Sequence, residues 1–469
     1  MEREASAANA KHDFSKGKIS QHIISLAVPL TVAQLVVVLY NMVDRAFIGH
    51  IEVVGRDAFI GIGLVMPITY IITAFSNLCG TGGAPLFSIA RGKGDEAEAG
   101  RIMGNAFLLI LSLAAVMMIL CWVFAEPLLY LVGGSETTVG YAASYLRLYL
   151  IGTLPVMLSL GMNPFINAQG FGRIGMLTVL LGAAANIALD PFFIFTLKLG
   201  VRGAALATVI AQSLSAVWVL SFLCGRRALI RLKLHALRFD FAIIRRITAL
   251  GLTGFTFSAT NSIVQSVGNS LLQRYGGQNM GDLYVGAMTV ITSLREIVFQ
   301  PIRGMTAGAQ PIMGFNYGAE QYGRVRECIV FITKAVLVYS SAVWLLIHCF
   351  PQFVIRLFNS DPGLLAVGVK SIHIYYAAYF IMGLMNVGQQ TFVALGHAKK
   401  AIFFSLLRKL FLAVPLMMLL PRFHGLGAYG VFASEPISDL IVSTVCYTAM
   451  MLTVWRPLGQ KMTAEKRSG

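Results

Sequence analysis

Charged residues are scarce in this sequence. Only 12% of the residues are Asp, Glu, Lys or Arg, whereas a soluble domain has about 25%. Hydrophobic residues make up 57% of the chain, and the mean hydropathy is +0.72. The composition therefore argues against a soluble protein and predicts an integral membrane protein, whose outer surface is solvated by lipid.

Several motifs that carry enzyme chemistry are also absent from the sequence. The six cysteines form no Cys-x-x-Cys pair, so neither a disulfide framework nor a metal site is predicted. We find no Gly-x-x-x-x-Gly-Lys-[Ser/Thr] motif, no nucleophile elbow and no paired His/Asp motif in the loops. We therefore expect neither an enzyme nor a bound cofactor. The formal charge of +16 is spread over short loops between apolar runs, which argues against nucleic-acid binding.

Long apolar runs dominate what is present. A spanning helix needs roughly 20 mostly apolar residues, and an open sheet cannot cross lipid. The alternation that a β-barrel requires is absent. The sequence therefore predicts an all-α membrane protein with twelve transmembrane helices, at 21–50, 58–88, 102–124, 138–166, 174–196, 202–223, 247–273, 284–312, 327–350, 364–395, 401–420 and 426–454.

Lys and Arg are unevenly distributed among the connecting segments. If both termini are cytoplasmic, the inner segments hold several times more Lys and Arg than the outer loops, as the positive-inside rule requires. The first apolar run is too long for a signal-peptide core, so we expect it to remain as a helix. The predicted organisation is a cytoplasmic segment at 1–20, a six-helix lobe at 21–223, a basic cytoplasmic linker at 224–246, a second six-helix lobe at 247–454 and a cytoplasmic tail at 455–469.

The two halves of the chain resemble each other at an offset of about 226 residues. Each half holds six predicted spans, an even number, so the repeats share one orientation in the membrane. Transporters with parallel repeats place substrate between the halves and rock one half against the other. The corresponding residues are Gly82, Ala84 and Pro85 with Gly308, Gln310 and Pro311; Gly92 with Gly318; Ala168 and Gly170 with Ala394 and Gly396; and, one position out of register, Gly200 and Gly203 with Gly427 and Gly430.

Two acidic residues of the first half lie inside apolar spans. Asp44 and Asp190 each lie about 6 residues from the outer end of a span, and Thr208 has a similar position in the next one, which places all three roughly 9 Å below the outer surface. Tyr40 and Asn186 lie four residues before the two acids and therefore share their helix faces. Acids within lipid are costly and usually functional. The group is a candidate site for a proton or Na⁺; the alternative is helix capping or pairing with a neighbouring base.

The second half holds Glu296, Glu435 and Asp439 inside predicted spans. These acids are candidates for a polar site that attracts a cationic substrate. The alternative for each is a structural ion pair, with Arg295 or Arg303 as the nearest candidates for Glu296. In the first span, Pro29 removes a helix hydrogen bond and is expected to produce a kink.

Four segments of the sequence carry a shared pattern: PLTVAQLVVVLYNMVDRAFIGH, NPFINAQGFGRIGMLTVLLGAAANIALDP, GVRGAALAT and PIRGMTAGAQPIMGFNYGAEQYGRV. The first contains a Val-Asp pair followed five residues later by Gly. Together the segments resemble the multidrug and toxic compound extrusion (MATE) transporters over nearly the full length of the chain, and the Val-Asp pattern is similar to the first helix of that family. The closest resemblance is to bacterial members with an acidic site in the N-terminal lobe.

The resemblance implies two six-helix lobes in a V and the export of drugs or toxins driven by entry of H⁺ or Na⁺. Some members bind Na⁺ through acids in the spans that correspond to 247–273 and 364–395, but neither span has an acid here, and the second offers Lys370 and His373 instead. A C-lobe sodium site of that kind is therefore not expected. By motif position, the resemblance assigns the cation site to Asp44, Asn186, Asp190 and Thr208, with Tyr40 as aromatic neighbour, Asn163 as a further polar residue and Pro29 as the kink.

The sequence thus predicts a secondary antiporter that exports small cationic or amphiphilic drugs and toxins by alternating access. We expect a monomer embedded in the lipid bilayer of a bacterial cytoplasmic membrane, with H⁺ or Na⁺ as the coupling ion and no other cofactor. The alternative is a lipid-linked precursor flippase of the same wider superfamily, although such proteins often carry a more basic cavity and extra helices.

Overall fold

The computed structural model describes residues 13–49, 55–131, 136–233, 237–358, 361–423 and 425–468. These residues are helical or lie in short connections, and none of them forms a strand. Seven helices among them are long and apolar enough to cross a membrane, and the number rises to nine if each of two bent helix pairs is one span. The prediction of an all-α protein with many spans is confirmed, and the exact number of twelve stays a prediction.

Contacts divide the chain into two compact units. Unit 1 comprises residues 1–16 and 28–255, and unit 2 comprises residues 17–27 and 256–469. Helices α2 (Ile19–Gly49) and α10 (Phe241–Gly318) each contribute to both units. Pro29 lies in α2 one residue after its passage from unit 2 into unit 1. The helix predicted to bend at Pro29 is therefore one of the two that connect the units.

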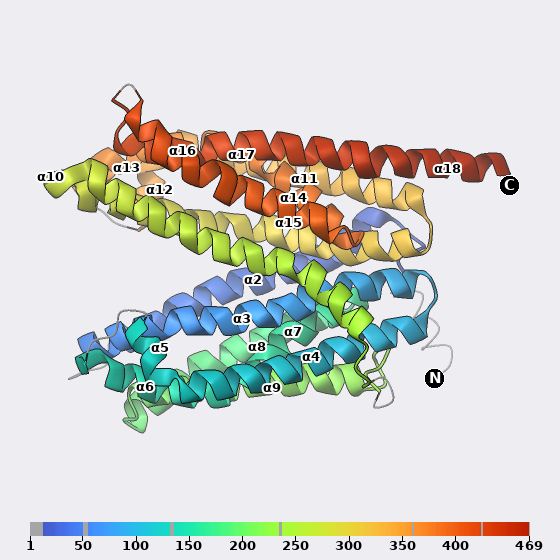
Figure 1. The fold of residues 1–469 in the computed structure, drawn as a ribbon, viewed down its shortest axis with the longest axis horizontal. Coiled ribbons are helices and arrows are strands. Elements are labelled where there is room, and N and C mark those ends of the chain that lie inside the picture. The colour runs from blue at the N-terminus through green and yellow to red at the C-terminus, as the bar shows by residue number, and fades with distance from the viewer. Residues whose placement is uncertain are drawn as a thin grey trace. The chain divides into compact units, whose positions relative to one another are not determined.

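Unit 1 is a bundle in which neighbouring helices pack along their lengths. Figure 1 shows α3, α4, α7, α8 and α9 side by side, and the contacts agree, since α3 packs on α4 and α7 while α9 packs on α7 and α8. Besides parts of α2 and α10, its helices are α3 (Gly55–Gly92), α4 (Glu96–Val123), α5 (Ala125–Leu131), α6 (Glu136–Ile151), α7 (Thr153–Ala168), α8 (Gly172–Pro191), the π-helix η1 (Phe192–Thr196) and α9 (Val201–Cys224).

Unit 2 is built around α17, which packs on α13, α14, α16 and η3. Within α10, Gly277 has a φ of 63° and separates two helices. The other elements are α11 (Tyr322–Cys349), α12 (Pro351–Arg356), α13 (Pro362–Tyr375), α14 (Tyr379–Ala394), α15 (Ala398–Leu406), the π-helix η3 (Leu407–Ala413), α16 (Val414–Leu419), the 3₁₀ turn η4 (Leu420–Arg422), α17 (Ala428–Met450), the π-helix η5 (Met451–Trp455) and α18 (Arg456–Ser468).

Corresponding positions of the two halves share unusual backbone conformations. Gly200 precedes α9 with φ 54° and ψ −128°, and Gly427 precedes α17 with φ 51° and ψ −133°. Gly170 and Gly396, another predicted pair, both have positive φ. Left-handed backbone of this kind favours glycine. These shared conformations support the predicted repeat.

Two glycines allow helices α3 and α10 to approach closely within unit 1. A Cβ on Gly82 would lie 2.0 Å from the carbonyl oxygen of Ile247, and a Cβ on Gly251 would lie 1.9 Å from that of Leu78. Small residues at such contacts let helix backbones pack against each other in membranes. The glycines are therefore required for this helix contact.

Replacing Gly251 by Leu is expected to destabilise unit 1 by about 1–3 kcal/mol or more, because the side chain would force the two backbones apart. Thermal unfolding of the purified protein in detergent measures this effect. The matched control is Gly254→Leu, in the same helix, where the nearest atom to a new Cβ is the Thr81 hydroxyl at 3.4 Å. Equal melting temperatures for the two variants would contradict the assignment.

Candidate functional site

Three of the predicted site residues lie together in unit 1. Asp190 is fully buried at the end of α8, and Asn186 is 4% exposed one turn earlier. The Asn186 amide donates to Asp190 Oδ1 at 3.3 Å and approaches Thr208 Oγ1 on α9 at 3.4 Å. The Thr208 hydroxyl in turn donates to the carbonyl of Ala204 at 3.0 Å. A carboxylate, an amide and a hydroxyl therefore form one connected polar group, as the spacing predicted.

Local backbone features position this group. Pro191 closes α8 directly after Asp190, and the π-helix η1 follows at once. The chain then turns at Gly200 into α9, where a Cβ on Gly203 would lie only 2.7 Å from the Phe193 carbonyl oxygen. The glycine lets the start of α9 pack against η1 and so brings Thr208 beside α8. π-helical segments of this kind are frequent at functional sites.

Asn163 belongs to a different polar contact. Its amide on α7 donates to the carbonyl of Gly175 at 3.1 Å and accepts from the Thr178 hydroxyl at 3.2 Å. Both partners lie on α8, nearer its start than Asn186. Asn163 therefore joins α7 to α8, and its place in the cation site stays a prediction.

The remaining unit 1 candidates lie on α2. Tyr40 is half-buried, and its phenol interacts electrostatically with that of Tyr149 on α6. Asp44 follows one turn later in α2, and its side chain lies outside the described part of the structure. The participation of Asp44 in the cation site therefore stays a prediction from the sequence.

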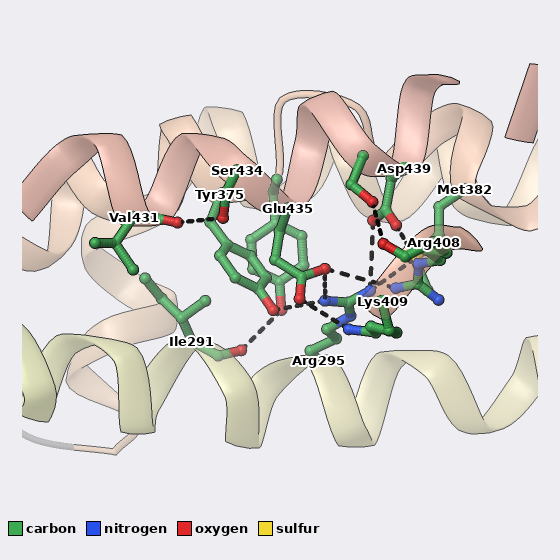
Figure 2. Close-up of polar contacts among 12 residues, drawn as sticks. Ile291, Arg295, Tyr375, Met382, Arg408, Lys409, Val431, Ser434, Glu435 and Asp439 are labelled. Atoms are coloured by element: carbon green, nitrogen blue, oxygen red, sulfur yellow. Dashed lines mark hydrogen bonds and ion pairs between the residues drawn. The ribbon is translucent and has the colours of Figure 1, made fainter. Parts of the chain in front are cut away.

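A second buried polar group lies in unit 2 and is shown in Figure 2. Arg295 on α10 donates from Nη1 to Glu435 Oε2 at 2.9 Å and lies 3.4 Å from Asp439 Oδ2. Arg408 on η3 donates from Nε to Asp439 Oδ1 at 2.6 Å, and Lys409 donates to Glu435 Oε1 at 2.8 Å. We call these five residues, Arg295, Arg408, Lys409, Glu435 and Asp439, the unit 2 charge cluster.

The unit 2 charge cluster is buried and tightly connected. Its side chains are between 3% and 13% exposed. The hydroxyl of Tyr375 accepts from Arg295 Nη1 at 2.6 Å. Arg408 also lies 3.6 Å from Glu435 Oε2. Each acid therefore contacts two or more bases, and the cluster contains three bases and two acids.

The predicted acids of the second half thus have two different surroundings. Glu435 and Asp439 are both matched by bases, so they leave no negative charge for a cationic cargo. Glu296 has a side chain that is 64% exposed; it accepts from Gln300 at 3.0 Å and lies 3.9 Å from Arg303. All three acids therefore lie close to bases, as the alternative of structural ion pairs predicted.

Sequence reasoning missed Arg408 and Lys409. Both lie in the apolar span Ala398–Arg422, and a buried base costs as much in lipid as a buried acid. The signal was present in the run FFSLLRKLFLAVPLMMLL, where two adjacent bases interrupt an apolar stretch. Reading intramembrane bases by the same rule as acids would have marked Arg408 and Lys409 as candidates, although not their pairing with Glu435 and Asp439.

The two helical units, their apolar spans and their buried ionisable groups define a multi-pass membrane protein of the transporter class. Among the described residues, no group of three or more His, Cys, Asp or Glu could hold a metal ion. The family model described as MatE matches residues 29–192 and 258–419. The chain belongs to this family, the multidrug and toxic compound extrusion transporters, which are membrane transporters and not enzymes.

The relatives cover nearly the whole chain at low identity. The chain is 22% identical to the multidrug export protein MepA of Staphylococcus haemolyticus, over 97% of both chains. It is 23% identical to the FAD transporter of Shewanella oneidensis, over 93% of this chain and 95% of that one. A solved outward-facing MATE transporter of the MOP superfamily, 21% identical, superposes with a TM-score of 0.87 over 95% of this chain and 98% of that one. The similarity to this solved structure concerns the fold alone.

Proposed function

We propose that this protein is a secondary antiporter that exports small drugs or toxins in exchange for H⁺ or Na⁺ bound at the polar group of Asp190. The observation that carries the proposal is a fully buried carboxylate, held by Asn186 beside Thr208, in a chain of the MATE family. Buried acids in membrane spans characteristically mark ion pathways.

The chemistry of the group suits a small cation. A carboxylate without a bound cation is costly in a low-dielectric interior, so binding a proton or a Na⁺ there offsets the desolvation. The hydroxyl oxygen of Thr208 and the amide oxygen of Asn186 are hard ligands that Na⁺ prefers, while a proton needs the carboxylate alone. Asp44, one turn after Tyr40 on α2, completes the proposed site.

The proposed architecture has twelve spans in two six-helix lobes, at 21–223 and 247–454, related by a parallel repeat. Both termini and the 224–246 linker face the cytoplasm, and the carrier works as a monomer in the lipid bilayer. The lobes alternate between inward-open and outward-open states, and α2, with Pro29 near its passage between units, is one of the helices that must adjust. Coupling requires that cation and substrate each bind the two states with different affinity.

The substrate class is supported by relatives named multidrug export proteins and by one named an FAD transporter. We assign small amphiphilic molecules on this basis. The two acids of the unit 2 charge cluster add no argument for a positively charged cargo, because three bases surround them. The flippase alternative gains no support from the family match.

Transport of a fluorescent amphiphilic cation in proteoliposomes tests the proposal. A pH gradient and a Na⁺ gradient are imposed separately, each with the substrate at equal concentration on both sides. The proposal predicts that at least one of the two gradients drives the substrate uphill, in the direction opposite to the cation. Failure of both gradients to move the substrate would reject cation-coupled export.

A further inference from the structure

The unit 2 charge cluster holds one more base than acid. Arg295, Arg408 and Lys409 face Glu435 and Asp439, which gives a formal charge of +1 if all five are ionised. The side chains are at most 13% exposed. An uncompensated charge in such surroundings is costly. The cluster is therefore stabilised by any process that removes one positive charge.

Lys409 is the base that can lose its charge. Arginine keeps its proton under all ordinary conditions in proteins, whereas a buried lysine can exist as a neutral amine. An ammonium group has three donors, and the described residues offer Lys409 Nζ one acceptor, Glu435 Oε1 at 2.8 Å. The two arginines have more contacts, since each approaches both acids.

The acids remain paired if Lys409 becomes neutral. Glu435 keeps its contacts with Arg295 at 2.9 Å and Arg408 at 3.6 Å. Asp439 keeps its contacts with Arg408 at 2.6 Å and Arg295 at 3.4 Å. Deprotonation of Lys409 therefore converts a cluster of three bases and two acids into a neutral set of two and two, without leaving any acid unpaired.

Lys409 lies among charged groups from three elements. Arg408 lies on the same π-helix η3, Glu435 and Asp439 come from α17, and Arg295 comes from α10, as Figure 2 shows. Farther out, the phenols of Tyr375 on α13 and Tyr379 on α14 interact with Arg295. The charge state of Lys409 is thus coupled directly to α10 and α17, and through Arg295 to α13 and α14.

We propose that Lys409 is a proton-exchange group of unit 2. Its Nζ–H bond breaks with the electron pair left on nitrogen and the proton passing to water in one conformation of the carrier; in the other conformation the amine takes a proton back from water. Lys409 lies near the middle of the span Ala398–Arg422 on a π-helical segment, a backbone form frequent at functional sites. The inference rests on the proposed antiport and adds a second coupling group to it.

Two variants hold the cluster in one charge state each. K409R keeps a permanent positive charge beside Glu435, and K409M removes the charge while retaining a long apolar side chain. Under an imposed pH gradient, both variants are expected to export substrate about tenfold more slowly than the wild type. The wild-type rate is expected to depend on pH at alkaline values, where an amine loses its proton, and K409R is expected to lack this dependence. Exchange of labelled for unlabelled substrate, which needs no net proton movement, is expected to continue in both.

Lys370→Arg is the matched control, because Lys370 is an exposed lysine of unit 2 that lies over the Tyr429 ring at 4.1 Å; it should export like the wild type. Size-exclusion profiles in detergent check folding.

If K409R keeps the wild-type rate and pH profile, Lys409 is a fixed charge and the inference is wrong. Wild-type export driven by Na⁺ but not by a pH gradient would also overturn it while leaving the proposed function intact; export driven by neither gradient would reject the proposed function itself.

Discussion

Asp190→Asn is expected to uncouple export from the cation gradient while the protein stays folded. Asparagine has nearly the same shape as aspartate and can still accept a hydrogen bond from Asn186, but it cannot bind and release a proton and offers Na⁺ no charge. With the coupling lost, gradient-driven export should fall by about tenfold to a hundredfold. The measurement is uphill transport of a fluorescent amphiphilic cation in proteoliposomes. The same result is expected for Asp44→Asn, which tests the sequence-based part of the site.

Asp240→Asn supplies the control for this experiment. The Asp240 side chain accepts from the backbone amides of Ala242 and Ile243 at 3.0 and 3.2 Å, at the start of α10 and far along the chain from the candidate site. Asparagine serves equally well at such a helix start, so this variant should export like the wild type. Gradient-driven export by Asp190→Asn at the wild-type rate would remove Asp190 from the coupling mechanism.

Asp439→Asn is expected to destabilise the protein by about 3–5 kcal/mol, because it leaves two buried arginines and Lys409 with Glu435 as the single acid among them. Asp439 accepts from Arg408 at 2.6 Å and lies 3.4 Å from Arg295, all within a buried cluster. Neither arginine can neutralise itself by losing a proton. Thermal unfolding in detergent, followed by tryptophan fluorescence, measures the loss.

Two further variants give this stability prediction its controls. The double substitution of Asp439→Asn with Arg408→Met removes one charge of each sign and should recover most of the stability, since the cost of the single variant comes from a buried charge that has lost its partner. Glu126→Gln breaks the pair with Arg147, which has the same 2.9 Å length but side chains that are 54% and 48% exposed. Its effect should stay below about 1 kcal/mol. Equal destabilisation by Glu126→Gln and Asp439→Asn would show that burial does not govern the cluster.

The helical fold class and the contacts among Asn186, Asp190 and Thr208 could be predicted from the sequence because both depend on regular helix geometry. Apolar run length predicted many spans, and spacing by four predicted that Asn186 and Asp190 share a face of α8. The equal depth of Asp190 and Thr208 in the membrane predicted that Thr208 lies beside this pair. The 3.4 Å contact between Asn186 and Thr208 agrees with this prediction. The sequence also matched Gly200 with Gly427 in the repeat, but it did not predict the backbone conformation that the two share.

The unit 2 charge cluster could not be predicted in the same way. Arg408 and Lys409 are adjacent in sequence, and in a regular helix adjacent side chains point about 100° apart. We therefore did not expect both side chains to reach the same pair of acids. The structure replaces the regular helix by the π-helix η3, where both side chains are buried and reach α17. The spacing of residues in a regular helix gives no indication that a π-helix forms here. The same spacing does not show that Asn163 forms hydrogen bonds with Gly175 and Thr178, near the start of α8, rather than with Asp190.

The most direct test of the coupling is the substrate gradient at which net transport stops. Proteoliposomes are prepared with a series of imposed gradients of the driving cation, and for each the ratio of inner to outer substrate at zero net flux is measured. An antiporter links the two gradients thermodynamically, so the account predicts that this ratio rises in proportion to a fixed power of the cation ratio, and that it no longer does so in Asp190→Asn. A ratio that stays at one for every cation gradient would show that substrate moves without coupling and would contradict the account.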